Sequence, residues 1–183
     1  MKLYLIRHGE SETNLAKVYT GWSQVLLTET GKQQARALQP RLAAIPFDKV
    51  YSSDLIRAMQ TAALAYPAME AETTPLLREF DVGSLAGRAG GSVRIVNRDF
   101  TPFGGENREM INARARAFLD LLESDPKETV AAFSHAGYLR AMLGIVMESE
   151  LPQDTFLCPN CTVAIFEYDG KKWRLHSWNA AAL

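Results

Sequence analysis

The stretch "LYLIRHGESETN", residues 3 to 14, begins with four apolar residues and then becomes polar. Together with the preceding lysine it contains "KLYLI", residues 2–6, a short apolar run that is typical of a buried β-strand. Arg7, His8 and Gly9 follow directly, at the point where this strand should end. An arginine beside a histidine at the end of a buried strand predicts a polar site at that end.

The composition is that of an ordinary globular protein. The 183 residues are 47% hydrophobic and 22% charged, and this length predicts one domain, residues 1–183. Twenty Lys and Arg residues against 21 Asp and Glu residues give a formal net charge of −1, so we expect neither nucleic acid nor membrane as a partner. No stretch approaches the roughly 18 apolar residues of a membrane span, and we expect a cytoplasmic protein. These patterns leave the oligomeric state open.

The two cysteines, Cys158 and Cys161, form the motif "CPNC". The motif leads into a predicted strand instead of opening a helix, and the sequence holds no second cysteine pair that could complete a zinc site. We therefore interpret them as incidental thiols, with a redox pair as the alternative. No metal and no cofactor are expected.

Predicted strands alternate with predicted helices, which is typical of a largely parallel sheet covered on both faces. The strands are expected at residues 2–6, 48–52, 70–74 and 128–134, followed by two strands within 161–178 around an Asp-Gly turn. The helices are expected at residues 28–44, 53–66, 106–123 and 136–147. We therefore predict an α/β fold, a three-layer αβα sandwich with a mostly parallel central sheet.

Two of these helices carry more specific expectations. Thr28 is a plausible N-cap for the first helix, and Pro40 should kink or end it. The second helix should begin at Ser53 or Asp54.

Residues 83–106 contain a Gly- and Arg-rich stretch that we expect to be a surface excursion, with a short insert at about 84–104. The helix after it, residues 106–123, is expected to bury one apolar stripe. Helical spacing assigns that stripe to Met110, Ala113, Ala117, Phe118 and Leu121.

Cationic or potentially cationic residues gather at the predicted carboxyl ends of the strands. His8 ends the first strand, "FSHAG" puts His135 at the end of another, and Arg57 lies in the first turn of the helix after a third. Because ligands of open parallel sheets bind beyond the carboxyl ends of the strands, we expect these residues to share one rim with Arg7. Such a cluster, close to helix N-termini, predicts a phosphate group as its ligand. His176 lacks this setting and is expected to be structural.

Five motifs resemble, in order, those of the histidine phosphatase superfamily, in its phosphoglycerate mutase-like branch: "LIRHGESETN", "SSDLIRAMQTA", "LLREFDVG", "GGEN" and "FSHAG". The resemblance extends from about residue 2 to residue 178. It implies a phosphoglycerate mutase-like fold and a phosphohistidine intermediate formed on His8.

The same resemblance implies a role for each matching residue. Arg7, Arg57 and His135 would hold the phosphoryl oxygens, while Glu79 would give and take a proton. Asp81 and Glu10 are the alternatives for that proton. The remaining contacts with phosphate or substrate are expected at Asn14, Thr20, Gly21 and Ala136.

Three functions are compatible with these residues. A phosphomonoesterase acting on small phosphorylated metabolites, similar to an alpha-ribazole phosphatase or a sugar phosphatase, needs the phosphohistidine centre and water but no metal. A cofactor-dependent phosphoglycerate mutase is the second, but the insert is short and no Arg-Arg pair occurs in the sequence. A phospho-ligand binding module without catalysis is the third. The insert's Arg88, Arg94 and Arg98 are expected to form a solvated face, with entry into the site as the alternative.

Overall fold

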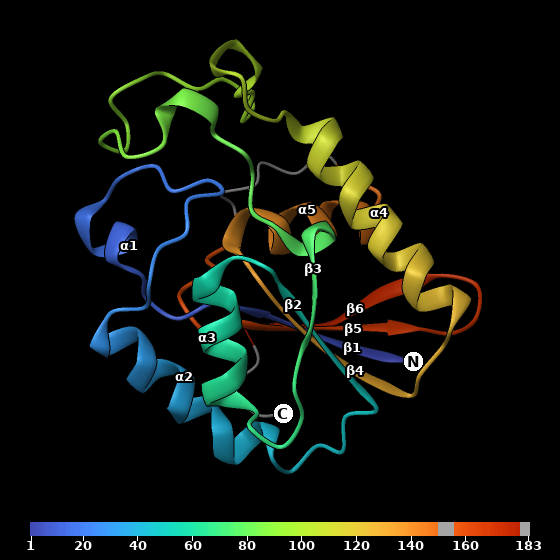
Figure 1. Ribbon diagram of the computed structural model, residues 1–183. Helices are drawn as coiled ribbons and strands as arrows, with labels where there is room; N and C mark the ends of the chain where they lie inside the picture. The colour runs from blue at the N-terminus through green and yellow to red at the C-terminus, as the bar shows by residue number, and fades with distance from the viewer. Residues whose placement is uncertain (150–155, 180–183) are drawn as a thin grey trace.

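A computed structural model describes residues 1–149 and 156–179 of the chain (Figure 1). Within these residues six strands form one sheet in the order β3-β2-β4-β1-β5-β6. Strands β1 to β4 run parallel, whereas β5 pairs antiparallel with β1 and β6 antiparallel with β5. Their bounds are β1 Lys2–Arg7, β2 Lys49–Ser53, β3 Glu72–Thr74, β4 Thr129–Ser134, β5 Val163–Tyr168 and β6 Trp173–Trp178. The prediction of a mostly parallel sheet is confirmed.

Helices cover both faces of this sheet. In the described residues they are α1 Glu12–Ala16, α2 Glu29–Leu42, α3 Ile56–Ala65, α4 Arg108–Ser124 and α5 Ala136–Val146. Side chains of β1 alternate between two cores: Tyr4 and Ile6 pack with α2 and α3, while Leu3 and Leu5 pack with α4 and α5. Figure 1 shows the same division, with the sheet between the two pairs of helices. The predicted three-layer αβα sandwich is therefore confirmed.

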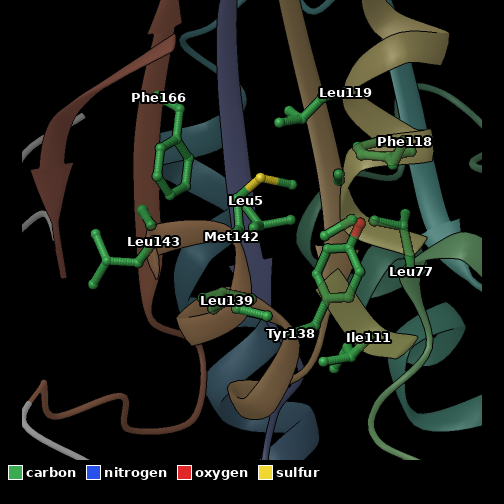
Figure 2. Packing of buried hydrophobic residues seen from close by; sticks show 14 of the residues in the cluster. Leu5, Leu77, Ile111, Phe118, Leu119, Tyr138, Leu139, Met142, Leu143 and Phe166 are labelled. Carbon is green, nitrogen blue, oxygen red and sulfur yellow. The ribbon is translucent and has the colours of Figure 1, made fainter. Parts of the chain in front are cut away.

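Helix α5 lies at the centre of the larger core (Figure 2). Burying one large aliphatic or aromatic side chain contributes about 1.5–3 kcal/mol, and α5 buries several on one face. That burial anchors α5, and with it the start of the helix next to the end of β4. The side chains of this core labelled in Figure 2 are Leu5, Leu77, Ile111, Phe118, Leu119, Tyr138, Leu139, Met142, Leu143 and Phe166.

The carboxyl ends of three parallel strands meet at one edge of the sheet. Arg7 at the end of β1 pairs in register with Ser134 at the end of β4. Ser52 near the end of β2 pairs with Phe133 of β4. The residues that follow these strands, including His8 and His135, are therefore brought together by backbone pairing alone.

The apolar stripe assigned to the helix at 106–123 is wrong, with the exception of Phe118. The other four positions, Met110, Ala113, Ala117 and Leu121, are exposed, whereas the buried residues of α4 are Ile111, Ala115, Phe118, Leu119 and Leu122. Both stripes fit helical spacing, but two of the four exposed positions are alanines, which offer little apolar area. The sheet instead receives the adjacent stripe, whose large aliphatic side chains gain more from burial.

Local signals also give two inexact predictions about helix ends. Of the two effects predicted for Pro40, ending the helix is wrong, because α2 continues to Leu42. Helix α3 begins at Ile56 and has no side-chain cap, because Ser53 and Asp54 make other contacts. The Ser53 hydroxyl pairs with His135, and the Asp54 carboxylate binds Arg78.

Candidate active site

His8 is held by its backbone directly after β1 and is 4% exposed. Its N–H donates to the carbonyl of Ser134 at 2.9 Å, and its own carbonyl accepts from the N–H of Cys161 and from Asn160 Nδ2. In the side chain, Nδ1 lies 2.6 Å from the carbonyl oxygen of Gly9. A carbonyl oxygen can only accept, so Nδ1 carries the proton and Nε2 keeps its lone pair.

Arg57 lies in the first turn of α3 and is 1% exposed. Its Nε donates to Nε2 of His8 at 3.3 Å, which fits the tautomer assigned to that ring. The other two nitrogens donate to the carbonyls of Ser23 and Gly21 at 3.0 and 2.9 Å. Burial lowers the pKa of Arg57 to about 10, so the guanidinium stays charged at neutral pH.

The His8 imidazole is surrounded by conditions that favour its neutral form. Burial lowers the pKa of His8 well below its ordinary value, and the charges of Arg57 and Arg7 lower it further. A neutral imidazole with Nε2 unprotonated is a competent nucleophile. The same surroundings therefore keep His8 reactive and supply positive charge to any anion it would attack.

Arg7 and His135 each leave one buried polar atom without a partner among the described residues. Arg7 donates through Nη1 to the carbonyl of Cys158, but its Nε has no hydrogen bond. His135 is the N-cap of α5; its Nε2 lies 3.0 Å from Ser53 Oγ, and its Nδ1 is unpartnered. Its ring contacts that of His8, with centroids 5.1 Å apart. Unsatisfied buried groups of this kind call for a ligand or water, and an anion suits the arginine.

Burial, followed by the charge of Arg57, lowers the pKa of His135 well below its ordinary value. His135 is therefore uncharged at neutral pH.

Glu79 is half-buried, on the segment that follows a short 3₁₀ turn at Pro75–Leu77. One carboxylate oxygen accepts from the N–H of Phe80 at 2.9 Å, and the other from the N–H of Gly137 at 3.0 Å. The second contact puts the carboxylate at the N-terminus of α5, where the helix dipole favours a negative group. A Cβ on Gly137 would come within 2.1 Å of Glu79 Oε1, so this close approach requires glycine.

A cavity of about 190 Å³ brings most of the predicted residues together. Seven of the predicted site residues line it: Arg7, His8, Asn14, Thr20, Gly21, Arg57 and Glu79. His135 and Ala136 are not among its lining residues: His135 touches the His8 ring, and Ala136 is the first residue of α5. The two alternatives to Glu79 do not line it either. Asp81 caps the N–H of Gly83, and Glu10 accepts from the Thr28 hydroxyl.

The remaining residues that line the cavity are largely apolar, and we refer to them as its apolar wall. They are Val18, Tyr19, Phe80, Val82 and Phe100, with Arg98 as the charged residue. The Phe100 ring lies 6.2 Å from that of Tyr19 and 5.8 Å from that of Phe80, so the aromatic residues support one another. The sequence offered no periodic signal for this wall, because its members come from loops.

The insert is joined to this wall by backbone hydrogen bonds. The N–H of Tyr19 donates to the carbonyl of Arg88, the N–H of Gly87 donates to the carbonyl of Tyr19, and the N–H of Gly90 donates to Lys17. Arg88 and Arg94 are exposed, as expected of a solvated face, whereas Arg98 is half-buried and lines the cavity. The insert is therefore a surface excursion that also supplies part of the site.

Neither metal ligands nor reactive thiols stand out. Across residues 1–149 and 156–179, no group of three or more His, Cys, Asp or Glu side chains could hold a metal ion. In that same part of the chain, no helix is both long enough and apolar enough to span a membrane. Burial raises the pKa of Cys158, and that of Cys161 to about 12, so both thiols are protonated at neutral pH. The "CPNC" loop instead contributes backbone contacts to Arg7 and His8.

The carboxyl edge of this mostly parallel α/β sheet presents an unprotonated histidine nitrogen that contacts the buried Arg57, with the half-buried Arg7 next to it in the chain. The chain belongs to the histidine phosphatase superfamily (branch 1), whose family model matches residues 3–181. The resemblance inferred from the five motifs is confirmed.

Relatives within the family carry different activities in their names. The chain is 33% identical over 177 aligned residues to a 2,3-bisphosphoglycerate-dependent phosphoglycerate mutase of Brucella canis, with 83% of this chain and 86% of the relative covered. A phosphoserine phosphatase mutant from Entamoeba histolytica, in complex with phosphoserine, has a similar structure. It has a TM-score of 0.87 at 26% identity, covering 98% of this chain and 96% of that one.

A putative alpha-ribazole-5'-phosphate phosphatase from Escherichia coli is also similar, with a TM-score of 0.83 at 25% identity. The match covers 100% of this chain and 98% of the other. The family thus includes phosphatases and mutases, and its membership alone does not choose between them.

Proposed function

We propose that this protein is a phosphomonoesterase that hydrolyses small phosphorylated metabolites through a phosphohistidine on His8. The observation that carries this proposal is the fixed tautomer of His8. The ring proton is on Nδ1, which donates to the Gly9 carbonyl. Nε2 is therefore unprotonated, in a cavity that Arg57 and Arg7 also line.

In the first step, Nε2 of His8 attacks the phosphorus in line with the ester oxygen. A P–N bond forms as the P–O bond to the leaving group breaks. The Arg57 Nε–H, which now donates to Nε2, gains a phosphoryl oxygen as its acceptor. The Arg7 Nε–H, unpartnered among the described residues, is a second donor to that group, and His135 is a third contact. Such preorganised donors stabilise charge on the equatorial oxygens, so we propose that no metal is needed.

Glu79 is proposed to move the protons. In its acid form it protonates the departing ester oxygen, and as a carboxylate it then takes a proton from the attacking water. The P–N bond breaks in this second step, which releases inorganic phosphate and returns the lone pair to Nε2. Its place on the cavity supports both roles, and the two backbone N–H groups, which stabilise the carboxylate, support its role as the base that activates water.

The apolar wall supports compact substrates whose leaving group has an apolar part. The cavity of about 190 Å³ is smaller than the roughly 300–1,000 Å³ typical of drug-sized ligands, and much of it must take the phosphoryl group. Tyr19, Phe80 and Phe100 would face the leaving group and exclude water from it. The cytoplasmic location and the single-domain organisation of residues 1–183 stay predictions from the sequence.

A phosphoglycerate mutase is the second candidate, because a relative with that name is 33% identical. A bisphosphorylated glycerate carries a second phosphate and a carboxylate, which need cations of their own. Among the described residues that line the cavity, Arg98 is the only cation besides Arg7 and Arg57. This charge balance favours a monophosphorylated substrate with a small leaving group over a bisphosphate.

One assay separates the two candidates. The purified protein is incubated with 3-phosphoglycerate, with and without 2,3-bisphosphoglycerate, and in parallel with benzyl phosphate; released phosphate and 2-phosphoglycerate are both followed by ³¹P NMR. We expect phosphate release, fastest from benzyl phosphate, and no isomerisation. Isomerisation that exceeds phosphate release would establish the mutase instead.

A further inference from the structure

The segment that carries Glu79 has an unusual backbone: each carbonyl from residue 76 to residue 79 accepts a hydrogen bond from a side chain. Arg114 of α4 donates to the carbonyls of Leu76, Arg78 and Glu79 at 3.1, 2.9 and 3.1 Å. The hydroxyl of Ser134 donates to the carbonyl of Leu77 at 2.7 Å. All four carbonyls of this segment are thus paired, although the segment lies outside the sheet.

Arg114 uses all five of its N–H groups in this arrangement. Besides the three carbonyls, it makes two parallel bonds to the carboxylate of Glu106, at 2.9 and 2.7 Å. The Arg114 and Glu106 side chains are 17% and 7% exposed, so the ion pair is poorly screened by solvent. Only a planar, five-donor side chain can satisfy a carboxylate and three carbonyls at once.

Glu106 belongs to the motif "GGEN", to which the phosphoryl chemistry gives no role. Its carboxylate oxygen Oε2 also accepts from the N–H of Asp81 at 3.0 Å, two residues after Glu79. Its own N–H donates to the carbonyl of Asp81 at 2.9 Å. The pair therefore binds the backbone on both sides of Glu79: Arg114 before it and Glu106 after it.

Trp22, whose ring centroid lies 5.9 Å from the Arg114 guanidinium carbon, adds a third support. Its indole N–H donates to the carbonyl of Glu79 at 2.7 Å, the same oxygen that Arg114 binds. The guanidinium of Arg78 lies over the Trp22 ring, 4.6 Å from its centroid, and pairs with Asp54. Leu77 points into the core beside Ile111 and Phe118 of α4 (Figure 2).

We propose that Arg114, fixed by Glu106, is a positioning residue that sets the Glu79 carboxylate against the leaving group by holding the backbone carbonyls of residues 76–79. This inference rests on the proposed role of Glu79. Arg114 does not line the cavity, so it acts through that residue and touches no substrate. A catalytic group that is misplaced by about 1 Å can lose roughly 100-fold in rate, which makes such a support measurable.

The test is Arg114→Lys, which keeps the positive charge but loses the planar fork. In rapid-quench experiments, we expect the rate of the burst of benzyl alcohol from benzyl phosphate to fall by about 10-fold to 100-fold. The burst rate with p-nitrophenyl phosphate should change by less than about threefold. The reason is that the basic alkoxide of benzyl alcohol needs a well-placed acid, whereas p-nitrophenolate leaves without one. Arg116→Lys on the same helix is the matched control, because Arg116 is exposed and should leave both bursts unchanged.

A double variant separates positioning from a general loss of structure. In the Glu79→Gln background, Arg114→Lys should cause no further slowing with benzyl phosphate, because the acid is already gone. If the two losses multiply, or if Arg114→Lys slows both substrates equally, Arg114 is a structural residue and the inference is wrong. If Glu79→Gln itself fails to separate the two substrates, the proposed acid is wrong and the proposed function needs revision first.

Glu106→Gln provides an independent variant should Arg114→Lys fold poorly. The amide has the same shape but no charge, so it loosens Arg114 and keeps the backbone contacts with Asp81. The same selective loss with benzyl phosphate is expected, at a smaller size. An unchanged benzyl phosphate burst in folded Glu106→Gln would overturn the part assigned to this carboxylate.

Discussion

The two sides of the cavity are built in different ways. On the side proposed for the phosphoryl group, His8 and Arg57 line the cavity and His135 lies behind them in contact with the His8 ring; these three residues follow the ends of β1, β2 and β4, and all are buried. On the side proposed for the leaving group, the lining residues come from loops, and they include the half-buried Tyr19 and Arg98 as well as the buried Phe80 and Phe100. The first set is placed by the register of a parallel sheet, whereas the second is placed by contacts between two irregular segments.

This difference separates the residues proposed to carry out phosphoryl transfer from those proposed to select the leaving group. Sheet register tolerates little change, because a shift of β1 against β4 would move His8 away from its partners. Loops tolerate substitution and changes of length, so the leaving-group wall can vary while the nucleophile stays in place. Relatives named as mutases and neighbours named as phosphatases of different compounds fit this division.

The largest effect is expected from removing the nucleophile. His8→Ala should lower turnover of every phosphomonoester by at least about 1,000-fold and abolish acid-labile phosphorylation of the protein. Both are measured with a ³²P-labelled substrate, and circular dichroism checks that the variant is folded. Wild-type turnover in a folded His8→Ala protein would show that His8 is not the nucleophile, and the role proposed for the residues around it would be wrong.

Removing the proton donor should have an effect that depends on the substrate. Glu79→Gln should slow the burst with benzyl phosphate by about 100-fold to 10,000-fold and leave that with p-nitrophenyl phosphate near wild type. Dephosphorylation of His8 should also slow, because the same carboxylate activates the water. Phosphoenzyme should therefore accumulate even with the aryl ester.

Two results would contradict this assignment. Equal losses in both bursts would make Glu79 a residue that only positions the substrate. No loss in either burst would transfer the acid role to Asp81 or Glu10.

Protein stability should fall in acid because two imidazoles are buried in neutral form. The pKa values of His8 and His135 are lowered in the folded state, so below about pH 6.5 the unfolded chain binds more protons than the folded one. The free energy of unfolding should then fall by up to about 1.4 kcal/mol per pH unit for each imidazole that stays neutral. Above that pH the two groups should contribute no slope.

Urea denaturation of the wild type and His8→Ala at pH values on both sides of about 6.5 measures this slope. His8→Ala should lose stability less steeply in acid, because one buried imidazole is gone. Parallel curves for the two proteins would mean that His8 is not held neutral by its surroundings.

A smaller, selective effect is expected on the leaving-group side. Val18→Thr keeps the shape of the side chain and adds a hydroxyl to the apolar wall. It should lower kcat/KM for benzyl phosphate by about threefold to tenfold and leave glycerol 3-phosphate nearly unchanged. The rate of phosphohistidine hydrolysis should stay at the wild-type value, since the leaving group has already departed. A change in that rate would show that the two sides of the cavity are coupled.

No effect at all is expected from metal removal. Turnover of p-nitrophenyl phosphate should be the same with and without excess EDTA, because Arg7 and Arg57 supply the positive charge. Complete loss of turnover that Mg²⁺ or Zn²⁺ restores would contradict the proposal that phosphoryl transfer needs no metal.

Much of the fold and part of the site can be predicted from local patterns. Apolar runs of strand length alternate with amphipathic helices, which is sufficient for a mostly parallel sheet with two helical layers. The position of a residue at a strand's end is also local, so His8 and His135 could be assigned to one edge before the strand order was known. The residues of five motifs, in their order along the chain, resembled those of the family, which the family model confirms.

Only the tertiary structure decided how α4 faces the sheet, what holds Glu79, and what lines the leaving-group wall. Helix α4 has two stripes that satisfy the same periodicity, and the choice depends on the surface it meets. The contacts of Glu79 with Gly137 and of its carbonyl with Arg114 join residues 58 and 35 positions apart. Periodicity records only which residues share a face of one element, whereas such contacts depend on how separate elements cross, which the packing of the whole chain sets.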